Sequence, residues 1–145
     1  MTFDLNPGAR LLVDGCQYTV EEQQAFHDVD FRLDLLRLSG PTRAHERWLL
    51  AALSEPYPML MQQLEMGWLA PPQTSIVHDG ELFANLLRGV ANRSRRTRTE
   101  RTKDARVEYA LFRANSGRVI FLAGQNERLD AWIGMTLPLE AIVVK

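Results

Sequence analysis

The sequence predicts a mainly β protein, an antiparallel sandwich or barrel-like domain with at most one or two short helices. Short runs rich in β-branched and aromatic residues alternate with Gly, Pro, Asn and Asp, which is typical of strands and turns. Two pairs of such runs flank hairpin signals, at Asp14-Gly15 and at Asn115-Ser116-Gly117. Four prolines between residues 56 and 72 break the middle of the chain, which disfavours long helices there.

The first third reads as three or four strands. Residues 10–14 and 17–22 flank Asp14-Gly15 and predict a hairpin. Residues 29–38 alternate charged and apolar side chains, and Ser39-Gly40-Pro41 closes that run with a turn. Residues 43–53 fit a helix or a strand, and we favour a strand because Gly40-Pro41 reads as a connection between two sheet-like runs.

The middle of the chain is more ambiguous. Residues 57–69 have room for one or two strands, and residues 74–79 predict a short strand that ends at Asp79-Gly80. Residues 81–90 are the most helix-like stretch of the second half, because apolar side chains recur there at four-residue spacing. A twisted strand interrupted at Gly89 is the alternative.

The last forty residues carry the clearest strand pattern. Residues 106–114 and 118–122 predict a hairpin. Residues 129–135 predict a further strand, in which Gly134 offers a bulge or bend. Residues 139–144 predict a terminal strand so apolar that we expect it inside the sheet or against a helix.

Length and composition indicate one β-rich domain over residues 1–145. The single cysteine, Cys16, excludes an intramolecular disulfide. No apolar run approaches the roughly 20 residues that cross a bilayer, and no secretory signal pattern precedes the first strand. We therefore expect a cytoplasmic protein. Exposed sheet edges are compatible with a homodimer, but no self-complementary pattern requires one.

Several short motifs resemble the bacterial family called domain of unknown function 4178. They are Asn6-Pro7-Gly8-Ala9-Arg10, Asp14-Gly15 with Tyr18 and Val20, Arg47-Trp48-Leu49-Leu50, Trp68-Leu69, Gly89-Val90-Ala91, Val107-Glu108-Tyr109, Glu127-Arg128 with Ala131-Trp132 and Gly134, and Pro138 to Val144. The resemblance covers most of the chain and implies a β-rich bacterial cytoplasmic domain without assigned catalytic residues. It also implies a setting among envelope-stress and polyamine-related genes.

The charges are strongly segregated along the chain. Residues 88–106 hold eight of the 17 Lys and Arg residues and two of the 18 acids, so this segment is about six units positive. The rest is about seven units negative, although the whole protein has a net charge of −1. Such a dipolar chain can bind or steer anions.

Residues 92–106 contain Ala105 and no larger apolar residue, which predicts a basic exposed loop or hairpin tip. The candidate residues for binding an anion or a partner there are Arg93, Arg95, Arg96, Arg98, Arg101 and Lys103. A solvated connector explains the same composition. The acidic remainder of the protein and the lack of aromatic residues in the segment argue against nucleic acid.

The sequence contains no catalytic or metal-binding motif that we recognise. His27, His45 and His78 each stand beside an acid, but their spacing matches no paired-ligand pattern, so we expect no metal and no cofactor. The three tryptophans, at positions 48, 68 and 132, lie among aliphatic residues and are expected in the core.

Three functions follow from these observations. The first is a non-catalytic binding or accessory domain that engages a protein partner, in a bacterial envelope-stress or membrane-maintenance system. The second is a binder of anionic surfaces, nucleic acid or acidic lipid, through residues 93–106. The third is an enzyme whose site is assembled from distant residues such as His45, Glu46 and His78. We favour the first, and expect no catalytic residues.

Overall fold

The computed structural model describes residues 5–42, 46–52, 54–65, 74–125 and 128–145. Within these ranges the chain forms eleven strands, all paired antiparallel, and one short 3-10 helix. The elements are β1 (Arg10–Val13), β2 (Cys16–Asp28), β3 (Phe31–Ser39), β4 (Arg47–Ala52), β5 (Met59–Leu64), β6 (Ser75–His78), β7 (Glu81–Thr97), β8 (Arg101–Ala114), β9 (Arg118–Gln125), β10 (Arg128–Thr136), η2 (Leu139–Ala141) and β11 (Ile142–Val144).

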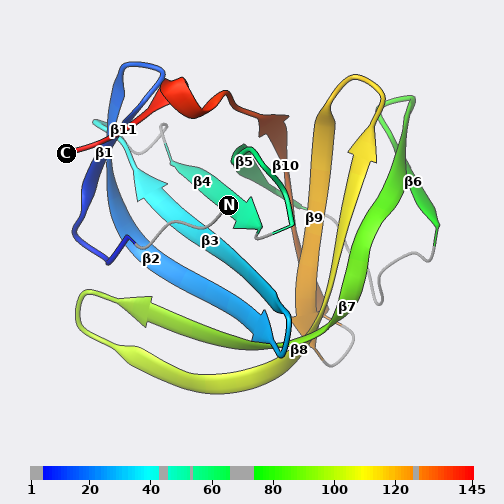
Figure 1. The fold of residues 1–145 in the computed structure, drawn as a ribbon, viewed down its shortest axis with the longest axis horizontal. Coiled ribbons are helices and arrows are strands. Elements are labelled where there is room, and N and C mark those ends of the chain that lie inside the picture. The colour runs from blue at the N-terminus through cyan, green and yellow to red at the C-terminus, as the bar shows by residue number, and fades with distance from the viewer. Residues whose placement is uncertain (1–4, 43–45, 53, 66–73, 126–127) are drawn as a thin grey trace.

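Eight of these strands close into a barrel (Figure 1). The sheet runs in the order β11-β1-β2-β3-β4-β5-β10-β9-β8-β7-β6, and a second pairing of β2 with β7 closes the circle. Strands β1, β11 and β6 lie outside that circle. The expected mainly β, barrel-like fold is therefore confirmed.

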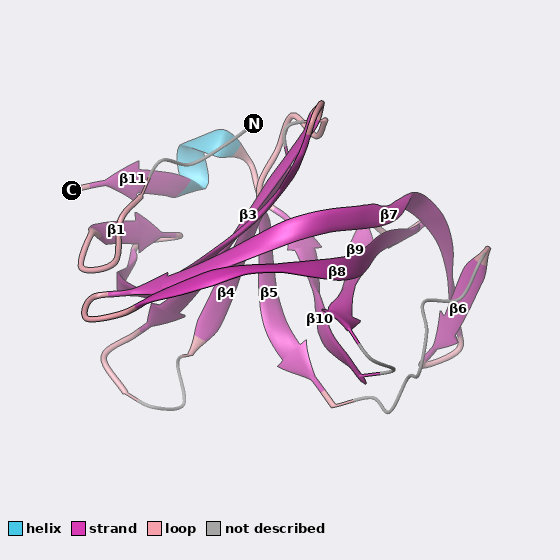
Figure 2. Cartoon of the chain, turned by 90° about the horizontal axis from the view of Figure 1, so that it is seen from below, coloured by secondary structure: helices cyan, strands magenta, loops and turns pink. Residues whose placement is uncertain are grey.

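The two strands that close the barrel, β2 and β7, each pair with two different strands along one edge. The beginning of β2 pairs with β1, whereas residues 22–27 pair with residues 92–97 of β7. The beginning of β7 likewise pairs with β6 before the strand turns toward β2. Figure 2 shows how far β7 and β8 extend alongside each other. This arrangement brings the basic half of the β7–β8 hairpin against the acidic first third of the chain.

The hairpin turns follow from residues that tolerate positive φ. Asp14 and Gly15 have φ angles of 49° and 77°, and they join β1 to β2 as the sequence predicted. Asp79 and Gly80 repeat this geometry between β6 and β7. Gly117, with φ of 91°, completes the predicted turn between β8 and β9.

Alternating side chains fill the inside of the barrel and cover parts of its outside. All eight barrel strands contribute to the inner cluster, in which Phe26, Phe121 and Trp132 are the largest fully buried residues. Along β8, Leu111 joins that inner cluster, whereas its neighbours on either side join an outer cluster beneath β6. A second outer cluster lies beneath β1 and β11. The described interior is thus a packed core.

Several local predictions were right. Residues 47–52 of the ambiguous stretch form a strand, and so do residues 75–78. Trp48 and Trp132 are core residues. Trp68 and residues 66–73 lie outside the described residues.

Two local predictions were wrong, and two segments for which the sequence left alternatives open form strands. Residues 81–90 form the first part of β7, so the strand alternative is right, and this strand continues through Gly89 without the expected interruption. The predicted terminal strand over 139–144 begins with helix η2, and β11 is an edge strand whose Val143 and Val144 are about half exposed. Gly134 lies in a regular ladder without a bulge. Residues 92–106, expected as a basic loop or hairpin tip, form the outer half of the β7–β8 hairpin, as described below.

Candidate anion-binding cleft

The basic segment, residues 92–106, is the outer half of the β7–β8 hairpin. Its first six residues belong to β7 and residues 101–106 belong to β8, so the turn between them is only residues 98–100. The Thr97 amide donates to the Glu100 carbonyl at 2.9 Å, and the Glu100 amide donates to the Thr97 hydroxyl at 3.1 Å. Because β7 also pairs with β2, the segment is held along both of its edges.

Strand alternation divides the arginines between the two sides of the barrel wall. Arg93 pairs with Phe26 and Arg95 with Gln24, which places both on the inward side. Arg96 pairs with Gln23 on the outward side. The arginines of this short segment therefore lie in two different environments.

The two inward arginines differ in their surroundings. Arg95 donates to the buried Glu22 carboxylate at 2.9 Å. Burial lowers the pKa of the Arg93 guanidinium, and the charge of Arg95 lowers it further, while Asp130 and Glu22 act in the opposite direction. The Arg95 side chain is therefore engaged in an ion pair, although it is 45% exposed.

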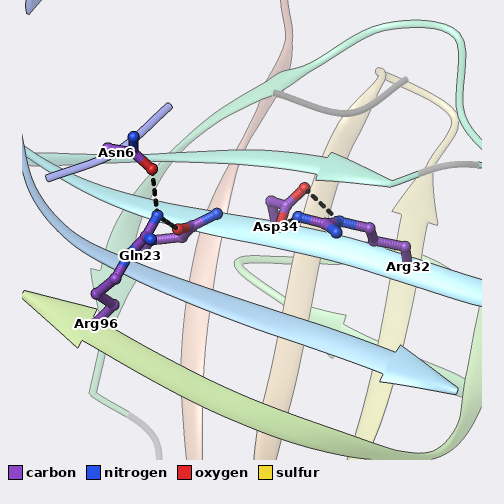
Figure 3. Close-up of polar contacts among 5 residues, drawn as sticks. All are labelled: Asn6, Gln23, Arg32, Asp34 and Arg96. Carbon is purple, nitrogen blue, oxygen red and sulfur yellow. Dashed lines mark hydrogen bonds and ion pairs between the residues drawn. The ribbon is translucent and has the colours of Figure 1, made fainter. Parts of the chain in front are cut away.

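On the outward side, Arg96 is held by two neutral amides (Figure 3). Its Nη2 donates to the Gln23 Oε1 at 2.6 Å and also to the Asn6 Oδ1. Gln23 is only 7% exposed, so it can hold the guanidinium in one orientation. Arg101 stands directly opposite Arg96 on β8.

These residues line one end of a cleft of about 480 Å³ over β2, β3, β7 and β8, which we call the basic cleft. Ala25 and Ser94, which pair with each other, lie in its lining. At the other end stand Arg32 and His27, which also pair with each other. The lining therefore contains small residues between two groups of basic ones.

The basic groups at this second end have acidic partners. Arg32 donates through Nε and Nη2 to the two oxygens of Asp34, each at 3.2 Å, and Asp34 is fully buried (Figure 3). The His27 Nε2 lies 3.4 Å from a carboxylate oxygen of Asp104. A bidentate pair leaves the remaining nitrogen of Arg32 free to donate elsewhere.

Arg96 and Arg101 differ in this respect, since neither forms an ion pair with any residue that the structure describes. Like charges placed directly opposite in a sheet destabilise it. An anion bound between the two guanidinium groups would remove that repulsion and accept bidentate hydrogen bonds. The cleft is thus suited to a carboxylate or a phosphate.

The structure brings together only part of the predicted site. Of the six predicted residues, Arg95, Arg96 and Arg101 line the cleft, although the Arg95 side chain is bonded to Glu22. Arg98 lies outside the lining and 3.4 Å from Glu21. The side chain of Lys103 lies outside the described part of the chain.

The sequence did not single out Asn6, Gln23 and Arg32 as site residues. Arg32 belongs to a run of alternating charged and apolar residues, a pattern that indicates an exposed side of a strand. That pattern indicates that Arg32 is exposed, but it does not show which distant residues lie beside it. The long-range pairing of β2 with β7 is what joins these residues to Arg96.

The other sites considered from sequence gain no support from the geometry. No group of three His, Cys, Asp or Glu side chains in the described ranges could hold a metal ion. The His78 Nε2 lies 3.3 Å from its neighbour Asp79, and His45 lies outside the described residues. Over the same ranges, no helix is long and apolar enough to cross a membrane.

Comparison with known proteins agrees with the sequence resemblance. The family described as Domain of unknown function (DUF4178) matches residues 6–139, nearly the whole chain. The chain belongs to this family. No curated protein and no solved structure matches the chain significantly. The matched range includes every residue that lines the basic cleft.

Proposed function

We propose that this member of the DUF4178 family is a non-catalytic binding domain that engages an acidic segment of a protein partner through the basic cleft. One observation carries the proposal. Arg96 and Arg101 lie directly opposite each other on the adjacent strands β7 and β8, at the cleft. No described carboxylate neutralises them.

The orientation of Arg96 supports binding more than simple solvation. A solvated arginine loses side-chain entropy when it binds, whereas Arg96 is already held by Gln23 and Asn6. Neutral acceptors fix the side chain without cancelling its charge. The site therefore keeps its attraction for an anion at a reduced entropic cost.

The surroundings of the cleft favour an acidic protein over a nucleic acid. Among the described residues, no Phe, Tyr or Trp lines it, so bases lack the large stacking partners that single-stranded nucleic-acid sites use. Asp34, Asp104 and Glu22 lie close to its basic residues, which weakens the long-range attraction of a polyanion. Short acidic segments need only local charge complementarity. An envelope-stress or membrane-maintenance setting for the partner stays a prediction.

Fluorescence anisotropy with labelled poly-glutamate tests this proposal. We expect salt-sensitive binding that is lost in the double variant R96Q/R101Q. Poly-lysine, a single-stranded oligonucleotide and vesicles containing phosphatidylserine form the comparison arms.

A matched control removes the same charge from the same hairpin but outside the cleft. Arg98 and Arg106 pair with Glu21 and Asp28, and neither lines the cleft. The double variant R98Q/R106Q should keep its affinity for poly-glutamate. Absence of poly-glutamate binding, or equal losses in both double variants, would overturn the proposal, and tighter binding of the oligonucleotide or vesicles would replace the partner class.

A further inference from the structure

The basic cleft has two cationic positions along one strand direction. The first is Arg96 with Arg101, opposite Gln23 of β2. The second is Arg32, opposite His27 of β2. Arg32 is paired with the buried Asp34 and offers its remaining guanidinium nitrogen to a ligand. Gln23 and His27 are four residues apart on the same side of β2, so both positions face the same solvent region.

The strand geometry gives the spacing between these positions. Four residues of an extended strand span about 13 Å. The Arg32 guanidinium bonds to Asp34, two residues nearer the first position, which reduces the separation along the strands toward about 7 Å. Because Arg96 and Arg32 belong to strands on opposite edges of β2, their backbones are also offset sideways by two strand spacings, about 10 Å, which their long side chains reduce by reaching over β2. A single carboxylate is too small to bridge this range.

We infer that the cleft recognises two acidic side chains on the same side of one extended peptide segment. The inference rests on the proposed function and specifies its ligand. In an extended peptide, side chains two or four residues apart share a side and are about 7 or 13 Å apart. For a peptide that runs parallel to β2, those two spacings match the separation of the two positions along the strands.

The middle of the cleft is compatible with a peptide running along it. Ala25 and Ser94 are small and leave space between the two cationic positions. The Ser94 hydroxyl forms no hydrogen bond to a described residue, so it can pair with a peptide backbone group. A helical ligand fits less well, because acids four residues apart on a helix are only about 6 Å apart.

Short peptides of serine and threonine with two glutamates test the spacing at constant charge. Peptides with glutamates two or four residues apart should bind about tenfold more tightly than peptides with glutamates one or three residues apart. A peptide with one glutamate should resemble the odd-spaced set. Titration calorimetry or anisotropy measures each dissociation constant.

Two variants assign the positions. R32Q should lower the affinity of the even-spaced peptides to that of the odd-spaced ones, whereas R101Q should weaken binding of every acidic peptide. Arg101 is exposed and forms no described ion pair, so R101Q should fold even if R32Q, which leaves the buried Asp34 without this partner, does not.

The outcomes of these experiments distinguish this inference from the proposed function on which it rests. Equal affinity for even and odd spacing, with binding still lost in R101Q, would overturn the two-acid inference and keep the acidic-partner proposal. Binding of no acidic peptide would overturn both. Displacement of the even-spaced peptide by an oligonucleotide of equal charge at lower concentration would indicate phosphate recognition instead.

Discussion

Replacing Gly134 by alanine should strongly destabilise the barrel, because the new Cβ would lie 1.9 Å from the backbone oxygen of Leu60. That gap must open to at least 3.0 Å, and the obstacle is backbone of the neighbouring strand β5. Losing about two ladder hydrogen bonds costs about 2 kcal/mol, and overpacking adds about 1–3 kcal/mol. We expect a loss of about 3–5 kcal/mol, or about 10 °C in melting temperature.

Urea unfolding followed by tryptophan fluorescence measures this change, with Gly89→Ala as the comparison. A Cβ on Gly89 would lie 2.8 Å from the Tyr109 hydroxyl oxygen, the end of a side chain that can shift. We expect a loss of about 1–2 kcal/mol, and recovery of part of it in the G89A/Y109F double variant. A Gly134→Ala variant as stable as the native chain, or less damaged than Gly89→Ala, would refute this reasoning.

Three further perturbations have expected outcomes. Trp132→Ala should cost about 3–5 kcal/mol in thermal or urea unfolding, because Trp132 is 2% exposed inside the barrel, and a loss below about 1 kcal/mol would contradict that packing. Arg95→Ala should cost about 1–2 kcal/mol by leaving the buried Glu22 without its ion pair, and the E22Q/R95A double variant should recover part of the loss. Burial raises the pKa of Tyr18 and Tyr109 above the ordinary value of 10.0. The neutral phenols are therefore favoured in the folded state. The stability that they contribute should be fully present below pH 10 and should fall as the pH rises above it. Y109F should reduce that fall in alkaline urea titrations, and an unchanged slope would contradict the role of burial.

The hairpins could be predicted from sequence because their information is local. Asp14-Gly15 and Asn115-Ser116-Gly117 each place turn residues between alternating runs, and both turns form. The ambiguity over residues 81–90 was also local. Leu82, Leu86 and Val90 are all partly exposed in β7, and a register shift between Asn85 and Leu87 interrupts the strand alternation, so the apolar spacing resembled a helix.

The basic cleft could be predicted only in part because its components are far apart in the chain. Charge density identified Arg96 and Arg101, but composition alone could not distinguish a loop from a hairpin tip. A strand with few apolar residues is stable here because it is paired along both edges, with β2 and β8. Pairing between distant strands leaves no local pattern in the sequence. Without knowledge of that pairing, Arg32, Gln23 and Asn6 could not be assigned to the site.

The pairing of β2 with β7 also has consequences during synthesis of the protein. Arg95 meets Glu22 across 73 residues of sequence, so β2 emerges from the ribosome well before its closing partner exists. At about 5–20 residues per second, that edge of β2 waits several seconds. Glu22, Gln23, Gln24 and His27 line the waiting edge. Polar side chains of this kind discourage pairing with other chains, so the residues that later border the cleft also protect the nascent barrel from aggregation.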